Sequence, residues 1–350
     1  TDTFSGFETV VGSGLNDVFV NATNSIVIQG GAGVDTLDYS GSANAVTVLF
    51  TGDGVGSVSG GAVASFTTVE SIIGSSGDDS LTGAAGAQYF FGGLGNDTID
   101  GGAGNDKLDY TGVLANITVN FATFTVTGTT VGTDAFSNIE IIAGGSGNDS
   151  ATGSAGADSF EGGDGNDTLM GGAGNDTFLG GNGNDLLDLS DATNNLSFQS
   201  NTFYFGNNGY ATVSGSTGTD SYHSIEGVKL GSGNDSILSF SGTGWVDAGS
   251  GNDSVVASNG HDTLLGGSGN DTLVGNDGND WFVGGAGNDS ISAGNGADVL
   301  DYSAVNGDLN VNLSTGAVSS DGQGGIDVIV TGTMDAVLGG SGNDLSLIHI

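Results

Sequence analysis

The sequence contains no cysteine and no proline, and only two of its 350 residues are lysine or arginine. Without cysteine no disulfide can staple the fold, so any stapling must come from another kind of link. The formal net charge of −39 argues against nucleic acids and anionic membranes as partners and favours cations. No apolar run approaches the roughly 18 residues of a transmembrane helix. The composition therefore predicts a cation-binding chain with no transmembrane segment.

Glycine and aspartate dominate what is present. There are 70 glycines, and 36 of the 41 acidic residues are aspartate rather than glutamate. Aspartate has a short side chain that hydrogen-bonds local backbone and tolerates turn geometry, so this bias places the acids in turns. So much glycine is also typical of disordered chains, and only a regular period in the sequence argues against disorder.

A nine-residue period runs through the chain with the pattern G-G-x-G-N-D-x-[LIFV]-x. Residues 92–100 read GGLGNDTID, and residues 101–109 read GGAGNDKLD. Uninterrupted nonads fill residues 74–109, 144–188 and 230–301, weaker ones fill 12–38, and a broken one starts at Gly339. The first six residues of a nonad are expected to form a turn, in which glycine and asparagine supply positive φ angles. The last three are expected to form a short strand.

This pattern resembles the hemolysin-type, or repeats-in-toxin (RTX), proteins, whose nonapeptides are a known signature of a calcium-binding parallel β-helix. The resemblance implies an all-β fold, a right-handed parallel β-roll or β-helix solenoid in which two nonads make one turn. The coil then rises by one strand spacing, about 4.8 Å, every 18 residues. The middle residue of each strand should point into a thin core, as predicted for Ile99, Leu108, Leu169, Phe178, Leu264, Leu273, Phe282 and Ile291.

Calcium is expected to hold this fold together. One apolar residue per nonad buries too little surface to offset the entropy of ordering nine residues. Stacked aspartates also repel one another, by roughly 3 kcal/mol at about 5 Å and an effective dielectric near 20. Ca²⁺ accepts oxygens from carboxylates and backbone carbonyls alike, and so reverses the sign of this interaction. We therefore expect the chain to be largely unfolded without calcium.

The resemblance implies that the aspartates at position six of the nonads share several calcium ions with carbonyls of neighbouring turns. The predicted ligands are Asp35, Asp79, Asp97, Asp106, Asp149, Asp158, Asp167, Asp176, Asp185, Asp235, Asp253, Asp262, Asp271, Asp280, Asp289 and Asp298. Asp17 is a less regular candidate. Gln88, Gly244 and Ile26 replace the aspartate and predict turns with few ions or none.

Other polar positions leave alternatives open. A second acid ends several nonads and is either an outer calcium ligand or a solvated strand end; these residues are Asp38, Asp100, Asp109, Asp188, Asp247 and Asp301. Zinc is not expected, because there is no cysteine and the three histidines are scattered. His261 occupies the asparagine position of a turn and is interpreted as a turn residue.

Alternating sequences between the repeats predict half-buried strands, as in residues 117–121 and 123–126. We interpret these segments as β-inserts that continue the solenoid as extra coils or hairpins. Before each following block stands an acid within an apolar group. Glu70, Glu140 and Glu226 either reach the first ion of the following block or face water. The predicted segments are a partial repeat block 1–38, inserts 39–73, 110–143, 189–229 and 302–338, repeat blocks 74–109, 144–188 and 230–301, and a truncated repeat 339–350.

Both ends of the sequence suggest a piece of a longer protein. No initiator methionine or signal peptide opens the chain, so its start is expected to be internal. The last six residues, 345–350, break the pattern in mid-repeat. We interpret them as an artefact of sequence assembly.

Three functions compete for such a chain. The first is a calcium-binding structural scaffold of a large secreted bacterial protein, such as an adhesin, surface-layer protein or toxin. The second is the carrier region of a secreted RTX protease, lipase or epimerase, and the third is a glycan- or ice-binding solenoid. No H-E-x-x-H or G-x-S-x-G motif, cysteine nucleophile or phosphate loop is present, so these residues are not expected to be an enzyme.

Partners and location follow from the resemblance alone. It implies calcium as the ligand, export by a type I secretion machinery of a Gram-negative bacterium, and an extracellular or cell-surface location. Surface glycans and other cell-surface proteins are further candidate partners.

Overall fold

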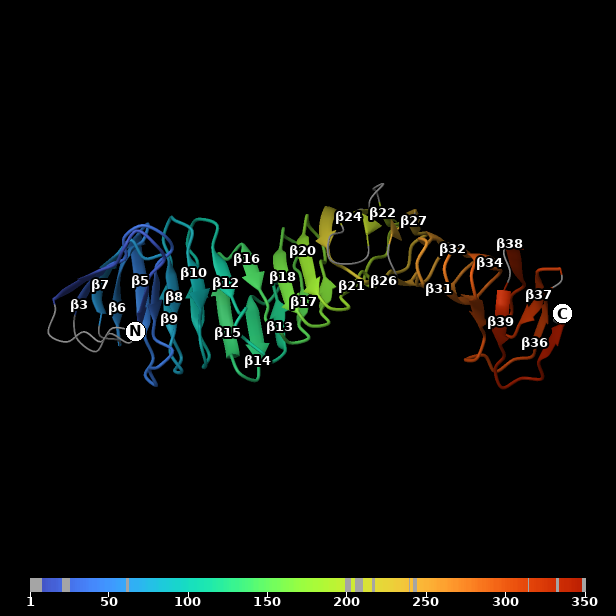
Figure 1. Ribbon diagram of the computed structural model, residues 1–350, viewed down its shortest axis with the longest axis horizontal. Helices are drawn as coiled ribbons and strands as arrows, with labels where there is room; N and C mark the ends of the chain where they lie inside the picture. Colours follow the sequence, from blue (N-terminus) through green and yellow to red (C-terminus); the bar gives the residue numbers. More distant parts are fainter. Residues whose placement is uncertain are drawn as a thin grey trace. The chain divides into compact units, whose positions relative to one another are not determined.

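The computed structural model describes residues 8–20, 26–60, 63–198, 203–204, 210–215, 218–238, 240–241, 244–313, 315–331 and 334–347. These residues form β-strands and turns without any helix, so none of them makes a helix that could cross a membrane. The chain divides into two compact units, one of residues 1–152 with 158–165 and one of residues 153–157 with 166–350. Figure 1 shows strands stacked side by side within each unit.

Within the described residues the nonads fold as a turn followed by a strand, and successive strands fall alternately in two sheets. The strand β11 (Thr98–Asp100) pairs in parallel with β9 (Ser80–Thr82), 18 residues earlier, with Ile99 opposite Leu81. Both of these middle side chains are completely buried. All eight middle residues predicted from the sequence lie in the core at 0% exposure. The all-β, mostly parallel roll predicted from the repeat is therefore confirmed.

In each unit one sheet contains the inserts and is called the inserted sheet, whereas the other is called the continuous sheet. In the first unit the inserted sheet has the order β1 (Thr9–Val11), β3 (Ile26–Gln29), β7 (Val63–Thr67), β6 (Val55–Ser59), β5 (Thr47–Gly52), β9, β11, β15 (Gly132–Ser137), β14 (Thr125–Gly128), β13 (Ile117–Asn120) and β17 (Ser150–Thr152). The continuous sheet has the order β2 (Val18–Val20), β4 (Thr36–Asp38), β8 (Ser71–Ile73), β10 (Tyr89–Phe91), β12 (Lys107–Asp109), β16 (Ile141–Ala143) and β18 (Ser159–Asp164).

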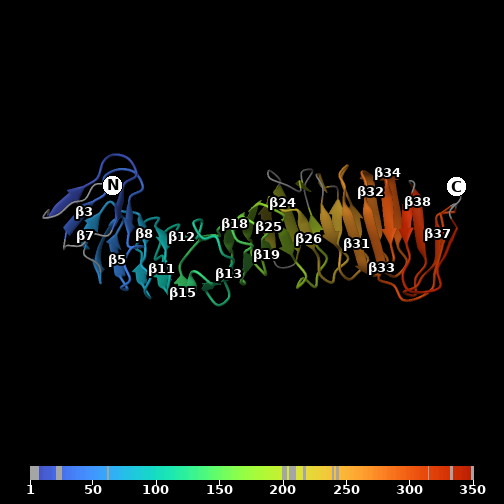
Figure 2. The same cartoon turned by 60° about the horizontal axis from the view of Figure 1, so that its bottom comes forward.

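The second unit repeats this plan, and Figure 2 shows its strands in colours from green to red. Its continuous sheet has the order β19 (Thr168–Met170), β21 (Leu186–Asp188), β26 (Gly227–Lys229), β29 (Trp245–Asp247), β31 (Thr263–Ser268), β33 (Trp281–Ala286), β35 (Asp298–Asp301) and β39 (Met334–Leu338). Its inserted sheet has the order β20 (Thr177–Asn182), β25 (Gly218–His223), β24 (Tyr210–Gly215), β22 (Ser197–Phe198), β27 (Ser236–Leu238), β30 (Ser254–Val256), β32 (Thr272–Asp277), β34 (Ser290–Asn295), β38 (Asp327–Thr331), β37 (Ala317–Asp321), β36 (Leu309–Asn312) and β40 (Leu345–Leu347). A separate pair joins β23 (Phe203–Tyr204) to β28 (Phe240–Ser241).

Each insert is a three-stranded antiparallel meander that enters the stack in reverse order. In the first insert the last strand, β7, pairs with the preceding repeat strand β3, and the first strand, β5, pairs with the following repeat strand β9. The insert shares its core with the roll, because the ring of Phe50 packs edge-on against Phe66 at 4.9 Å and against Phe90 at 6.1 Å. The inserts are therefore parts of the roll.

Glycine and asparagine have different roles in the turns. Glycines at positions two and four adopt positive φ, such as Gly93 at 105° and Gly95 at 118°. Among the asparagines of the described nonads, Asn276 at position two adopts the expected positive φ, at 70°, whereas those at position five do not. Their side-chain oxygens instead accept the backbone N–H of the next coil, as Asn252 Oδ1 does from Asn270 at 2.7 Å. Asparagine at this position therefore forms a ladder between coils.

The tail after Asp344 begins as a strand. Leu345–Leu347 form β40, which pairs with β36, and residues 348–350 lie outside the described part of the chain.

Candidate metal-binding turns

The position-six aspartates form ladders along the turns. The backbone N–H of Asp79 donates to Oδ1 of Asp97, 18 residues later, at 2.7 Å. The same bond recurs between 2.7 and 2.9 Å for the pairs 17–35, 88–106, 167–185, 235–253, 244–262, 253–271, 262–280, 271–289 and 280–298. One carboxylate oxygen of each later residue thus ties two coils together.

The other carboxylate oxygen has no hydrogen-bond partner in most of these turns. It is buried and unpartnered in Asp35, Asp97, Asp106, Asp185, Asp235, Asp253, Asp271, Asp280, Asp289 and Asp298. A buried polar atom without a partner costs about 1–3 kcal/mol, and more when it is charged. An ionised carboxylate in this position therefore requires a positive charge beside it.

Burial and neighbouring carboxylates oppose ionisation of these groups. The pKa of Asp97 is raised to about 7, mainly by burial; the charges of Asp134 and Asp79 contribute to the rise, and a hydrogen bond from the backbone of Asp79 opposes it. The pKa of Asp253 also rises to about 7, first through burial and then through Asp271 and Asp235. Burial likewise raises to about 6 the pKa values of Asp106, Asp185, Asp280 and Asp289.

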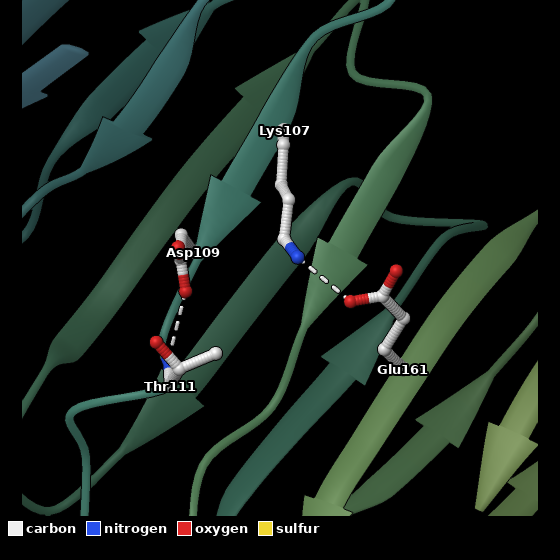
Figure 3. Close-up of polar contacts among 4 residues, drawn as sticks. All are labelled: Lys107, Asp109, Thr111 and Glu161. Atoms are coloured by element: carbon white, nitrogen blue, oxygen red, sulfur yellow. Dashed lines mark hydrogen bonds and ion pairs between the residues drawn. The ribbon is translucent and has the colours of Figure 1, made fainter. Parts of the chain in front are cut away.

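With two lysines and no arginine, the chain has too few basic side chains to place a positive charge beside each buried carboxylate. Lys107 forms an ion pair with Glu161 at 2.7 Å across the continuous sheet of the first unit (Figure 3). A hard divalent cation fits the turns better, because buried carboxylate oxygens and turn carbonyls are calcium ligands. No three histidine or acidic side chains converge on one point within the described ranges. Backbone carbonyls, which the resemblance implies, or water must therefore supply the remaining ligands of any calcium site.

The predicted ligands are nearly all placed alike. Every one is buried except Asp158, which is half-buried. Asp17 is also half-buried, although its backbone joins the ladder. Gln88 keeps the ladder through its backbone N–H and uses its side-chain oxygen to accept the N–H of Ala84 at 3.1 Å. It contributes no carboxylate to its turn, and Gly244 contributes none either.

The acids at position nine have a role that neither sequence alternative named. Asp109 Oδ1 accepts the backbone N–H of Thr111 at 3.0 Å, which caps the turn leaving the strand (Figure 3). The same contact, two residues ahead, occurs at Asp38, Asp100, Asp188, Asp247 and Asp301. His261 is confirmed as a turn residue, because its Nδ1 accepts the N–H of Asn279 at 2.7 Å within the ladder.

The acids that precede the blocks lie beside the preceding block. We call Glu70, Glu140, Glu226 and Asp335 the exit acids. Glu140 Oε2 accepts the N–H of Asp106, the last position-six residue of the block before it, at 2.7 Å. Equivalent bonds at 2.8–3.0 Å join Glu70 to Asp35, Glu226 to Asp185 and Asp335 to Asp298. Neither sequence alternative named this contact, in which each glutamate side chain binds the last repeat of the preceding block.

Sequence reasoning missed a second set of acids inside the inserts. We call Asp134, Asp220 and Asp327 the insert aspartates; their Oδ1 atoms accept the N–H groups of Asp97, Asp176 and Asp289 at 2.9–3.0 Å. They are buried and continue the ladder on the inserted sheet. One signal could have found two of them, because Asp134 and Asp220 each stand six residues before an exit glutamate.

Comparison with known families agrees with this arrangement. The family model described as RTX calcium-binding nonapeptide repeat matches residues 69–98, 83–111, 134–169, 152–187, 161–194, 238–273 and 274–309. Together these segments cover half of the chain, and they include Glu70, Asp134 and Glu140 from the inserts. No curated protein shows a significant match to the sequence.

Proposed function

Because the chain belongs to the family of RTX calcium-binding nonapeptide repeats, we propose that it is a calcium-folded structural region of a larger secreted bacterial protein. One observation carries this proposal. The carboxylate oxygen that the ladder leaves unused is buried without a partner in ten predicted ligands, from Asp35 to Asp298. This is the atom that a calcium ion would take.

The energetic argument for calcium as a folding ligand rests on buried charge. Removing an isolated carboxylate from water is costly unless it is neutralised or paired. Without the ion, the fold must either protonate groups such as Asp97 and Asp253 or bury them charged. An ion that binds only the stacked turns contributes its binding free energy to folding. The ligands proposed for it are the position-six aspartates and the carbonyls of adjacent turns.

We also propose that the residues of this chain perform no catalysis. The aspartates that could supply paired carboxylates are engaged by backbone N–H groups of the ladder, which supports a structural role for them. A scaffold within an adhesin, surface-layer protein or toxin is our first choice. The carrier region of a secreted enzyme differs from it only through domains outside these residues, and a longer gene sequence would distinguish the two.

Secretion belongs to the same proposal. Calcium is scarce in the cytosol and abundant outside the cell, so a chain that needs calcium to fold would stay unfolded during export and fold outside. We propose a type I exporter and an extracellular or cell-surface location on the strength of the family resemblance.

Circular dichroism of the purified chain tests the proposal. In excess chelator the spectrum should be that of a coil, and calcium at about 0.1–1 mM should produce a cooperative β signal. Magnesium should replace calcium poorly, because it prefers a small octahedral site and retains its waters. A strong β signal at neutral pH in excess chelator would refute the proposal.

A further inference from the structure

Each ladder of position-six aspartates ends where an insert begins. The last residue of the ladder has different partners on the continuous sheet and on the inserted sheet. On the continuous sheet the last aspartate of a block is followed by an exit acid. Asp106 is completely buried with its Oδ2 unpartnered, while Glu140 beside it is exposed and binds the Asp106 N–H through Oε2. Asp35, Asp185 and Asp298 also have a buried, unpartnered Oδ2 and a backbone N–H bound by an exit acid, which is half-buried in Glu70 and Glu226 and exposed in Asp335.

On the inserted sheet a tyrosine hydroxyl donates a hydrogen bond to the corresponding carboxylate oxygen. The hydroxyl of Tyr110 donates to Oδ2 of Asp134 at 2.6 Å, and that of Tyr302 donates to Oδ2 of Asp327 at 2.5 Å. Both tyrosines are buried. These insert aspartates have both oxygens engaged within the protein, so they have no need of a cation.

The ladder position after an exit acid is also unusual. In the register of the continuous sheet, Gln88 is the next residue in line after Glu70, and Gly244 is the next after Glu226. Neither residue has a carboxylate that could bind an ion. After Glu140 comes Asp158, the one half-buried residue among the predicted ligands. At Glu70 and Glu226 the exit acid is thus the last carboxylate in its row, and at Glu140 the next carboxylate, Asp158, lies two strands away from Asp106.

We propose that the exit acids Glu70, Glu140, Glu226 and Asp335 are calcium ligands that complete the last ion of each ladder on the continuous sheet, whereas the insert aspartates bound by tyrosine end the other ladder without an ion. The proposal rests on the calcium-dependent function above and assigns ligands that the nonapeptide pattern does not contain. In each pair a buried, unpartnered aspartate oxygen belongs to the residue next to a second carboxylate, which is exposed in Glu140 and Asp335 and half-buried in Glu70 and Glu226. The charge of Glu140 also contributes to the raised pKa of Asp106.

The test is Glu140→Gln, measured by native mass spectrometry and calcium titration calorimetry on the full chain. The amide oxygen of glutamine can still accept the N–H of Asp106, so the ladder is retained and only the charge is removed. Glu161→Gln is the matched control, because it removes the same charge from the Lys107 ion pair on the same unit. We expect Glu140→Gln to bind one ion fewer than the wild type or to bind one ion at least about tenfold more weakly, and Glu161→Gln to match the wild type.

The outcomes separate the two proposals. If the wild type binds no calcium, the proposed function fails. If the wild type binds calcium but Glu140→Gln has the same ion count and affinities as Glu161→Gln, the exit acid is no ligand and the inference is overturned. Glu226→Gln in the second unit decides the matter if Glu140→Gln does not fold. Asp134→Asn should leave the ion count unchanged, and loss of an ion there would overturn the assignment of the tyrosine-bound ends.

Discussion

The hydroxyl of Tyr110 donates a 2.6 Å hydrogen bond to Oδ2 of Asp134, the same carboxylate atom that is buried without a partner in Asp97 one coil earlier. The two aspartates occupy equivalent ladder positions, since the N–H of Asp97 donates to Oδ1 of Asp134. A phenol thus takes the place that we assign to calcium in the repeats. The inserts therefore divide the roll into ion rows with defined ends.

This relationship predicts unequal effects of removing two buried tyrosine hydroxyls. Tyr110→Phe leaves Oδ2 of Asp134 buried without a donor and should lower the free energy of unfolding by about 1–3 kcal/mol. Tyr39 begins the first insert at the corresponding place, but its hydroxyl is buried without a partner. Tyr39→Phe should therefore change stability little or raise it. Urea unfolding in saturating calcium measures both, and equal losses would contradict the assignment.

The period of nine was enough to predict the repeat turns because it fixes the phase of every position. Ile99 had to face the core and Asp97 the turn once the strand spanned Thr98–Asp100. The ends of the ladders could not be predicted in this way. The alternation of apolar and polar residues predicted the insert strands. It does not predict their order, in which β7 rather than β5 pairs with β3.

The reversed order of the insert strands results from pairing between segments that are far apart in the sequence. This order determines which acidic residues become neighbours in the ladder. It brings Asp134 to the ladder position beside Asp97, whereas the continuous sheet brings Glu140 beside Asp106. The role of asparagine was missed for a related reason. Its ladder joins residues 18 apart, as in Asn252 and Asn270, and propensity describes only the local turn.

A glycine substitution tests how closely the coils approach. Gly165 stands at position four with φ of 116°, and an added Cβ would lie 2.0 Å from the carbonyl oxygen of Gly147. Gly165→Ala should cost at least about 1–3 kcal/mol through backbone strain and overpacking. Gly112→Ala is the control, since no atom lies within 4 Å of its added Cβ. Thermal unfolding in calcium compares them, and similar midpoints would contradict the close stacking of turns.

Acid should partly replace calcium in folding. The folded pKa values of Asp97 and Asp253 are raised to about 7, above the value near 3.9 expected in an unfolded chain. Their contribution to stability is therefore fully present below about pH 4 and is lost as pH rises through about 7. Without calcium, the β signal should grow as pH falls from about 8 to about 5. A constant or falling signal in circular dichroism would show that these carboxylates do not limit folding.

With calcium present, the same groups predict the opposite dependence. Protons and calcium compete for one carboxylate, so more calcium should be needed for folding at about pH 5 than at about pH 8.

Asp97→Asn imitates the protonated side chain and should weaken the pH dependence of the calcium-free chain. If the variant keeps the full wild-type dependence, other groups control it.

The position-six aspartates should differ in importance according to their burial. Asp271 is buried, accepts the N–H of Asp253 through Oδ1 and keeps Oδ2 without a partner. Asp271→Asn keeps the hydrogen-bond acceptor but removes the charge, so the calcium concentration at the folding midpoint should rise several-fold. Asp158 is half-buried, and water can solvate part of its charge, so Asp158→Asn should raise that midpoint less. Calcium titrations followed by circular dichroism rank the two variants. A larger effect at Asp158 would mean that the buried oxygen of Asp271 is not what binds the ion, and the carbonyls of the turn would then have to supply most of the site.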